Sequence, residues 1–314
     1  MKTKILISYH DEHKLIKSDI LQPIQTGCAN APKLFDGMIR DNDGENISDR
    51  NNQYNELSAQ YWAWKNYNKL GDPDYIGFMH YRRHFMFDGW EGNPQSLWLA
   101  NSNVYCVPCV CPEYLKHIND KHIKKQLKNC DCIVIKPYDL INIKRESIRE
   151  QYGRLTKQDI TNFDIFIKTA KEIAPEYIPE IEQIEKGHIQ YLCNMFVMTK
   201  DLFMEYSKFC FDVLFETEKR INVDTTDDAA ARALGYFGEF LLSIFIFKLK
   251  KNKNIRIKEL NASFILSDEQ IENLYFKYWY NWFMSKITWG KKKQKYKQKR
   301  KNIKKMICFY KNAS

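Results

Sequence analysis

The chain has 314 residues, 44% of them hydrophobic and 14% aromatic, which is enough for one large domain with or without an appendage. Its formal net charge is +10, yet 12 Lys and Arg and no acidic residue lie from Lys286 onward. The remainder holds 37 basic and 39 acidic residues, a net charge near −2, which argues against nucleic-acid binding by the body of the chain. Nine scattered cysteines and a charged N-terminus without a signal sequence predict a cytosolic protein with free thiols.

The first half of the chain predicts alternating strands and helices. Lys4 to Ser8 is apolar and β-branched and precedes a polar loop, as at the start of many nucleotide-binding domains. Residues 27–50 are rich in Asn, Asp and Gly and predict a loop. Asn55 is expected to cap a helix that ends near Tyr67, with a strand following at Tyr75 to Met79.

The second half continues this pattern. Strands are predicted at 104–110, 132–135, 193–198 and within 255–266, and helices at 159–173, 201–220 and 237–249. The apolar segment from Phe240 to Phe247 is too short to span a bilayer. The mixture favours an α/β fold with a mixed central sheet, one domain over residues 1–270 and a separate C-terminal segment over 271–314.

A cluster of basic side chains follows the buried strand at Tyr75 to Met79. The order is His80-Tyr81-Arg82-Arg83-His84, at the carboxyl end of a strand, where open α/β sheets bind ligands. Arginine donates paired hydrogen bonds in one plane, which suits phosphate. The cluster therefore predicts an anion site. The alternative is a solvated strand end, or arginines paired with aspartates (Asp72, Asp74, Asp88).

Two kinds of metal site are alternatives to this anion site. The Asp-x-Asp pairs that begin at Asp41 and Asp72 have the spacing of a diphosphate-metal site, but they fall in predicted turns, where Asp forms local hydrogen bonds. Cysteines at 106, 109, 111, 130 and 132 have irregular spacing in apolar segments, which favours core residues over zinc. No metal is expected; Mg²⁺ or Mn²⁺ is the less favoured alternative.

Acidic residues near the C-terminal third offer candidates for a general base. Glu239 opens an apolar segment, where a carboxyl pKa can rise toward the range of a base, although helix stabilisation explains the position equally well. Asp228 is the second candidate. His188 and Asn194 lie before or at the start of a predicted core strand and are weaker candidates for the same cleft.

Aromatic residues from Tyr275 to Trp289 adjoin the C-terminal basic run. Trp and Tyr beside Lys and Arg are typical of a segment that lies on an anionic membrane. The alternatives are a solvated tail and RNA binding. We expect membrane-surface contact and hence a peripheral location at the inner face of the cell membrane.

Four segments together resemble a bacterial family of capsular and exopolysaccharide synthesis proteins that includes galactofuranosyltransferases. They are YNELSAQYWAWKN, DYIGFMHYRRHF, CNMFVMTKDLFMEY and RALGYFGEFLLSIFI, and the resemblance covers residues 3–265. It implies a GT-A-like glycosyltransferase with a Rossmann-type nucleotide-sugar half, followed here by a basic, aromatic helical tail. His80 to Arg83 stand where many such enzymes carry Asp-x-Asp, which places metal dependence in question.

The resemblance implies a nucleoside-diphosphate sugar donor, expected to be UDP-linked with galactofuranose as a candidate sugar, and a lipid-linked saccharide acceptor in capsule, exopolysaccharide or O-antigen synthesis. Arg82 and Arg83 are expected to stabilise the leaving diphosphate and Glu239, or Asp228, to act as base. Donor contacts are expected from Tyr9, His10, Glu56, Gln60, Trp64, Lys65, Asn66, His80 and Tyr81, and acceptor contacts from His188 and Asn194. A non-catalytic saccharide- or RNA-binding protein and a glycoside hydrolase are the alternatives; the hydrolase lacks an evident carboxylate pair.

Overall fold

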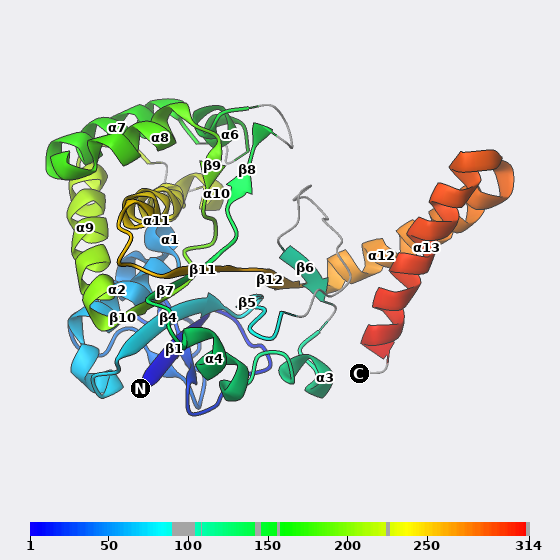
Figure 1. The fold of residues 1–314 in the computed structure, drawn as a ribbon, viewed down its shortest axis with the longest axis horizontal. Coiled ribbons are helices and arrows are strands. Elements are labelled where there is room, and N and C mark those ends of the chain that lie inside the picture. Colours follow the sequence, from blue (N-terminus) through cyan, green and yellow to red (C-terminus); the bar gives the residue numbers. More distant parts are fainter. Residues whose placement is uncertain (90–103, 108, 142–145, 156–157, 224–226, 312–314) are drawn as a thin grey trace. The chain divides into compact units, whose positions relative to one another are not determined.

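The computed structural model describes residues 1–89, 104–107, 109–141, 146–155, 158–223 and 227–311 (Figure 1). It divides into two compact units. Unit 1 comprises residues 1–81 and 124–260, and unit 2 comprises residues 82–123 and 261–314. The second unit thus groups the C-terminal segment with residues 261–270 and with a part of the chain far earlier in the sequence.

Unit 1 contains the larger part of a mixed sheet, with strands in the order β11-β7-β10-β4-β1-β2-β3. Its pairs β1–β2, β1–β4, β2–β3 and β7–β11 are parallel, whereas β10 runs antiparallel to both β4 and β7. The strands are β1 (Thr3–Tyr9), β2 (Leu21–Gln25), β3 (Ile39–Arg40), β4 (Tyr75–His80), β7 (Cys132–Ile135), β10 (Phe196–Thr199) and β11 (Ile257–Leu260). A separate pair joins β8 (Tyr138–Asp139) to β9 (Ile189–Gln190).

Helices complete unit 1. They are α1 (Asn51–Tyr54), α2 (Leu57–Lys65), α6 (Ile148–Leu155), α7 (Ile160–Ile173), α8 (Ile178–Lys186), α9 (Lys200–Glu218), α10 (Asp228–Ala231) and α11 (Ala233–Lys251), with short 3-10 turns at Ser48–Arg50, Tyr67–Leu70 and Pro175–Tyr177. Helix α9 packs on β4 and β10 and also contacts α2 and α11. Rings of Phe78, Phe196 and Phe203 fill this contact, with centroids 5.2 to 6.2 Å apart. The core of unit 1 is therefore strongly aromatic.

Gly77 lets β10 approach β4 closely. A Cβ at this position would lie 2.8 Å from the Phe196 carbonyl oxygen and 2.7 Å from Val197 Cγ2. Only glycine avoids these contacts, which fixes the pairing of the two central strands.

Unit 2 contains β5 (Arg83–Phe85), β6 (Val104–Val107) and β12 (Ala262–Ile265), where β12 runs antiparallel to β5 and parallel to β6. It also holds α3 (Pro112–Leu115), α12 (Asp268–Ile287) and α13 (Gly290–Lys311), and the division between the units falls within α4 (Asp120–Leu127). Ser267 and Gln270 form a capping box that starts α12. Its first turns pack with β6, β12 and α13 in a small core that includes Phe264, Leu274 and Ile303.

Several predicted boundaries were wrong. Asn55 does not cap the long helix but ends α1 with φ +50°, and Glu56 takes the N-cap position of α2. The basic cluster is not one extended strand, because the chain turns at Tyr81 and Arg82 between β4 and β5. The expected alternation of Arg82, Arg83 and His84 therefore does not apply.

The predicted strand at 193–198 and the predicted single strand within 255–266 also required correction. Cys193 and Asn194 have left-handed φ angles of +73° and +46°, so β10 begins only at Phe196. Asn261 separates β11 from β12. The apolar helix begins at Ala233 instead of Phe237, which puts Glu239 in its second turn and not at its start. None of the helices in the described part of the chain is long and apolar enough to cross a membrane.

Candidate functional site

The carboxyl ends of three parallel strands meet at one edge of the sheet in unit 1. Ser8 on β1 is in register with His80 on β4, and Tyr9 is in register with Gln25 on β2. Parallel α/β sheets place their ligands at this edge. The structure thus brings together the predicted donor residues Tyr9, His10, His80 and Tyr81.

The ring of Tyr81 is the centre of an aromatic group at this edge. His13 stacks on it with centroids 4.3 Å apart, His10 meets it edge-on at 5.0 Å, and Tyr9 lies at 6.1 Å. Burial raises the pKa of Tyr9 to about 12, so its hydroxyl stays protonated and accepts a hydrogen bond from the Ile16 N–H at 3.1 Å. Sequence reasoning missed His13, since no pattern distinguishes it from a loop histidine.

Glu56 lies at the start of α2 and is the most strongly perturbed carboxylate in this region. Its Oε1 is 3.3 Å from Nε2 of His80 and accepts a hydrogen bond from Nδ2 of Asn194 at 2.9 Å. The side chain is only 14% exposed, and burial alone would raise its pKa. The attraction of His80 and the hydrogen bond from Asn194 outweigh burial and lower the pKa of Glu56 to about 2. Glu56 is therefore ionised at neutral pH.

Asn194 belongs to a strained segment before β10. Two consecutive non-glycine residues in the left-handed region, Cys193 and Asn194, are energetically unfavourable and are found at sites where the surroundings impose them. Here the Cys193 N–H donates to Oε1 of Glu239 at 2.7 Å, and Asn194 Nδ2 also donates to the carbonyl oxygen of Gly235 at 3.1 Å. Helix α11 thus holds the segment that contacts Glu56.

Several buried polar atoms near this group have no hydrogen-bond partner among the described residues. They include Oδ1 of Asn194, whose side chain is 2% exposed, Oγ of Ser8, which is 5% exposed, and Nε2 of His80. Ser8 is in register with His80, whose Nε2 lies near Glu56 without the geometry of a hydrogen bond. Buried polar atoms are nearly always paired in folded proteins, so these atoms are candidates for contact with a ligand.

The C-terminal end of α2 contacts a different part of unit 1. A helix rises about 1.5 Å per residue, so Lys65 lies roughly 13 Å along the axis from Glu56. Trp64 stacks on Phe211, Lys65 lies 3.3 Å from Glu45, and Asn66 donates to the carbonyl oxygen of Glu45 at 2.8 Å. Gln60 is buried between these ends. The structure therefore does not bring Trp64, Lys65 and Asn66 to the cluster around Glu56.

The two candidate bases and the second acceptor residue occupy separate positions. Glu239 is half-buried on α11 and reaches the Cys193 backbone. Asp228 begins α10, and its side chain lies outside the described residues. His188 pairs with Asp139 at 2.8 Å beside the β8–β9 pair. Of these three, only Glu239 is shown to contact the segment that holds Asn194.

Arg82 and Arg83 follow Tyr81 in the chain and begin unit 2. Arg82 donates from Nε to the Ile265 carbonyl oxygen at 3.0 Å and from Nη2 to Oε1 of Gln270 at 2.9 Å. Both guanidinium groups lie over the ring of Phe264. His84 is fully buried, with Nδ1 at 2.8 Å from the Tyr114 hydroxyl, and is a core residue of unit 2.

The aspartates that the alternative interpretation names as partners of these arginines have contacts with other residues. Asp72 lies 3.5 Å from Lys200, Asp74 accepts a hydrogen bond from the Lys2 N–H at 2.6 Å, and Asp88 lies 2.6 Å from His117.

The Asp-x-Asp pairs are also used in other contacts. Asp41 is fully buried and accepts hydrogen bonds from the Gly27 and Cys28 N–H groups and from the hydroxyls of Ser48 and Ser58, at 2.5 to 3.0 Å. Asp43 pairs with Lys69 at 2.9 Å. Within the described residues, no group of three or more His, Cys, Asp or Glu side chains is arranged to hold a metal ion. The carboxylate of Asp41 is therefore occupied by donors from the protein itself.

The fold and the polar edge of its sheet define a GT-A-like α/β protein, which confirms the expected fold class. The chain belongs to the family described as "Domain of unknown function (DUF4422)", whose model matches residues 4–253.

A solved structure of a WbbM bifunctional glycosyltransferase in its apo form is similar to the chain. The TM-score is 0.77 with 30% sequence identity, and the match covers 85% of this chain and 46% of that one. The chain therefore spans less than half the length of that protein. No curated protein matches the sequence.

Proposed function

We propose that this protein is a glycosyltransferase that moves a sugar from a nucleoside-diphosphate donor to a saccharide acceptor. The similarity to the WbbM bifunctional glycosyltransferase over 85% of the chain is the observation that carries the proposal. The polar groups at the carboxyl edge of β1 and β4, with Glu56, His80 and Asn194 in contact, support it as a place for the donor.

The proposed donor is UDP-linked, with galactofuranose as the first sugar to test, and the proposed acceptor is a lipid-linked saccharide of a cell-surface polysaccharide. The resemblance of four sequence segments to a family that includes galactofuranosyltransferases supports these choices. The aromatic group of Tyr9, His10, His13 and Tyr81 supports nucleotide binding, because flat rings stack on bases and sugars.

In the proposed reaction, Glu239 accepts the proton of an acceptor hydroxyl, with Asp228 as the second candidate. The hydroxyl oxygen forms a bond to the anomeric carbon, the bond from that carbon to the diphosphate breaks, and the nucleoside diphosphate leaves with the electron pair. Arg82 and Arg83 stabilise its negative charge. Donors aimed at developing charge are usually the largest single contribution to catalysis.

Thermal unfolding with a panel of nucleoside diphosphates tests the donor site directly. UDP should raise Tm in a concentration-dependent manner, while uridine without phosphates should have little effect. Turnover of UDP-galactofuranose with a saccharide acceptor, in buffer with and without EDTA, then tests the reaction, and we expect activity to persist in EDTA. Saccharide or RNA binding without any effect of nucleotides would favour a non-catalytic binding protein instead.

A further inference from the structure

The α12–α13 hairpin of unit 2 buries small polar side chains and exposes large aromatic ones. Asn281 and Ser285 are buried on α12, where they donate to the carbonyl oxygens of Lys277 and Trp282, both at 2.7 Å. Each thus donates a hydrogen bond within its own helix. A helix in a water-soluble protein normally buries an apolar stripe, whereas small residues and Ser or Asn at a helix contact are typical of helices in lipid.

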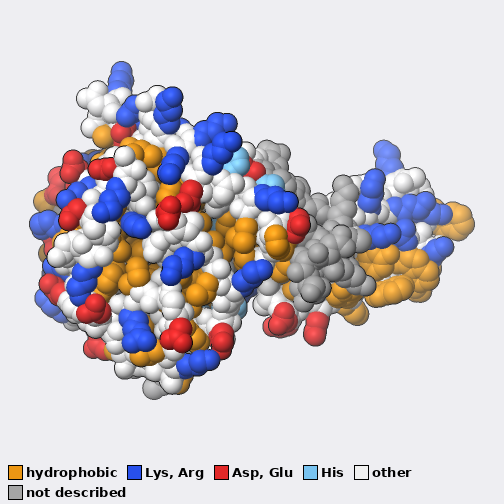
Figure 2. Space-filling view, turned by 90° about the horizontal axis from the view of Figure 1, so that it is seen from below, with side chains coloured by type: hydrophobic (Ala, Val, Ile, Leu, Met, Phe, Trp, Pro, Cys, Tyr) orange, Lys and Arg blue, Asp and Glu red, His pale blue; other side chains and the backbone are white. Residues whose placement is uncertain are grey.

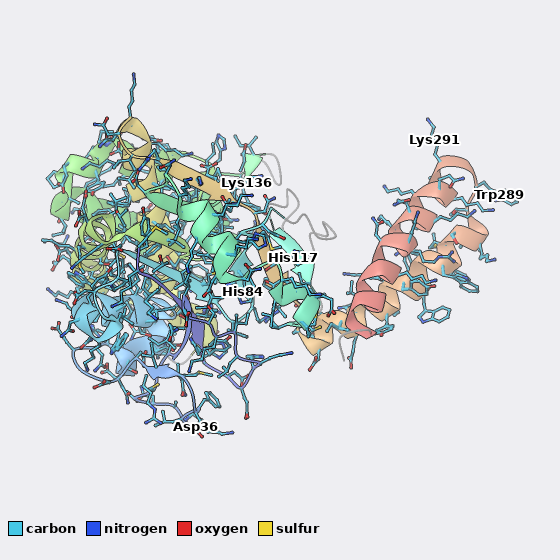
Figure 3. The ribbon with its side chains drawn as sticks, turned by 60° about the horizontal axis from the view of Figure 1, so that its bottom comes forward. Asp36, His84, His117, Lys136, Trp289 and Lys291 are labelled. Carbon is cyan, nitrogen blue, oxygen red and sulfur yellow. The ribbon has the colours of Figure 1, made fainter. Side chains whose placement is uncertain are left out.

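The opposite side of α12 carries an exposed stripe of large apolar side chains, here called the aromatic stripe. Its members are Phe276, Trp279, Tyr280, Phe283 and Ile287, with spacings of three and four residues that place them on one helix face. Phe276 is 72% exposed, and Trp289, at the tip of the hairpin, is 84% exposed (Figure 3). Contiguous exposed apolar surface of this kind marks an interaction site.

The second helix of the hairpin is rich in basic residues and has no acidic residue. From Lys286 to the end of the chain there are 12 Lys and Arg and no Asp or Glu, and most of them lie on α13. Figure 2 shows hydrophobic side chains gathered along one side of the hairpin and Lys and Arg gathered along the other. The partner must therefore offer both negative charge and an apolar layer.

We propose that the α12–α13 hairpin binds an anionic lipid bilayer surface. The aromatic stripe enters the boundary between headgroups and acyl chains, and the lysines of α13 contact the lipid phosphates. Trp, Tyr and Lys are favoured at membrane interfaces in this arrangement. This proposal does not depend on the proposed transferase activity.

Charge and geometry favour lipid over the two other occupants of such a surface. A second copy of the hairpin would bring two strongly basic helices together, which repel one another. Single-stranded RNA binds where aromatic and basic side chains share one groove, whereas here they gather on different sides of the hairpin.

Flotation of the full chain with vesicles tests the proposal. The test variant carries Phe276→Ser, Trp279→Ser and Phe283→Ser, and the control carries Leu34→Ser and Ile173→Ser, which are exposed apolar residues of unit 1. On phosphatidylcholine vesicles that contain phosphatidylglycerol, the test variant should lose roughly tenfold or more in binding, because three apolar side chains no longer enter the interface. The control should bind as the wild type. Equal binding by all three proteins would overturn the proposal.

A second variant tests whether the positive charge of α13 contributes to vesicle binding. Lys292→Gln, Lys295→Gln and Lys299→Gln should weaken binding to anionic vesicles and reduce its sensitivity to salt. Circular dichroism should show that both variants keep their helices. Two results would overturn the proposal. One is binding of single-stranded RNA that is tighter than vesicle binding and that the aromatic substitutions do not weaken. The other is a dimer, seen by sedimentation in the absence of vesicles, that dissociates when the aromatic residues are substituted.

Discussion

Asn194 donates from Nδ2 to Oε1 of Glu56 at 2.9 Å, which joins residues 138 positions apart in the chain. The same oxygen lies 3.3 Å from Nε2 of His80. Three segments therefore meet at one carboxylate: the start of α2, the end of β4 and the left-handed turn before β10. A change in any of the three side chains should alter the environment of the other two.

We expect Glu56→Gln to weaken donor binding. The substitution keeps an oxygen acceptor for Asn194 but removes the charge that faces His80, so the KM for a UDP-sugar should rise about tenfold while kcat changes less. Steady-state kinetics at varied donor concentration measure this split. Glu45→Gln, near the far end of α2, is the matched control and should leave KM unchanged. Identical KM values for both variants would remove Glu56 from the donor site.

Stability should depend on pH through Glu56. Its folded-state pKa of about 2 is below the ordinary value of 4.5, so the carboxylate stabilises the fold fully above pH 4.5 and loses this effect as pH falls toward 2. Urea unfolding of wild type and Glu56→Gln should therefore differ by roughly 2 to 3 kcal/mol at pH 7. The difference should shrink in acid, and a difference that stays constant with pH would contradict the lowered pKa of Glu56.

Asn194→Asp should destabilise the protein at neutral pH. It places a second carboxylate against Glu56, and two like charges in a buried position raise the pKa of at least one of them. Tm should fall at pH 7 and recover partly as pH is lowered. Asn194→Gly is the control, since it permits the left-handed φ of +46° and adds no charge, although it loses the hydrogen bonds to Glu56 and Gly235, about 2 to 4 kcal/mol together. Equal stability and equal pH dependence of the two variants would speak against the charge argument.

Glu239→Gln should abolish most turnover and leave the fold intact. The amide oxygen can still accept the hydrogen bond from the Cys193 N–H, but the side chain can no longer accept a proton from the substrate. Loss of a general base typically costs about a hundredfold or more in kcat. Glu216→Gln, on the surface of α9, serves as control. If Glu239→Gln keeps a turnover near that of the wild type, Glu239 is not the base. Asp228→Asn is then the next variant to measure.

Arg83→Ala and Arg82→Ala should each lower turnover about a hundredfold if the guanidinium groups stabilise the leaving diphosphate. Arg82→Ala should also lower Tm, because the Ile265 carbonyl oxygen and Gln270 lose their donor. Gln270→Ala separates the two effects, since it removes a partner of Arg82 and keeps the cation. If Gln270→Ala loses as much turnover as Arg82→Ala, the role of Arg82 is structural.

The apolar strands were predictable from sequence, whereas strands with polar or proline positions were not. The segments that form β1, β4 and β7 are short apolar runs, and the predicted bounds match the observed ones to within one residue at each end. Strand β2 escaped prediction because Pro23 and two glutamines interrupt its apolar pattern. Its place between β1 and β3 depends on long-range pairing that no local pattern encodes.

The candidate site was predictable in its residue types but not in its contacts. Glu56, His80, Asn194 and Glu239 were each selected for separate reasons, and nothing in their spacing indicated that Asn194 contacts Glu56. The left-handed conformation of Cys193 and Asn194 was hidden by an apolar sequence that favours a strand. Contacts with Glu239 and Gly235 impose that conformation, so only the tertiary structure reveals it.

The buried Asp41 has a further consequence for how this protein would meet a ligand. Its carboxylate gathers donors from a long irregular segment and from Ser58 in the first turn of α2. The loop is thereby ordered during folding, and the beginning of α2 is held in place together with it. The conformational entropy of this segment is therefore lost when the protein folds and not when a substrate binds. A substrate that contacts Glu56 would meet a preorganised surface.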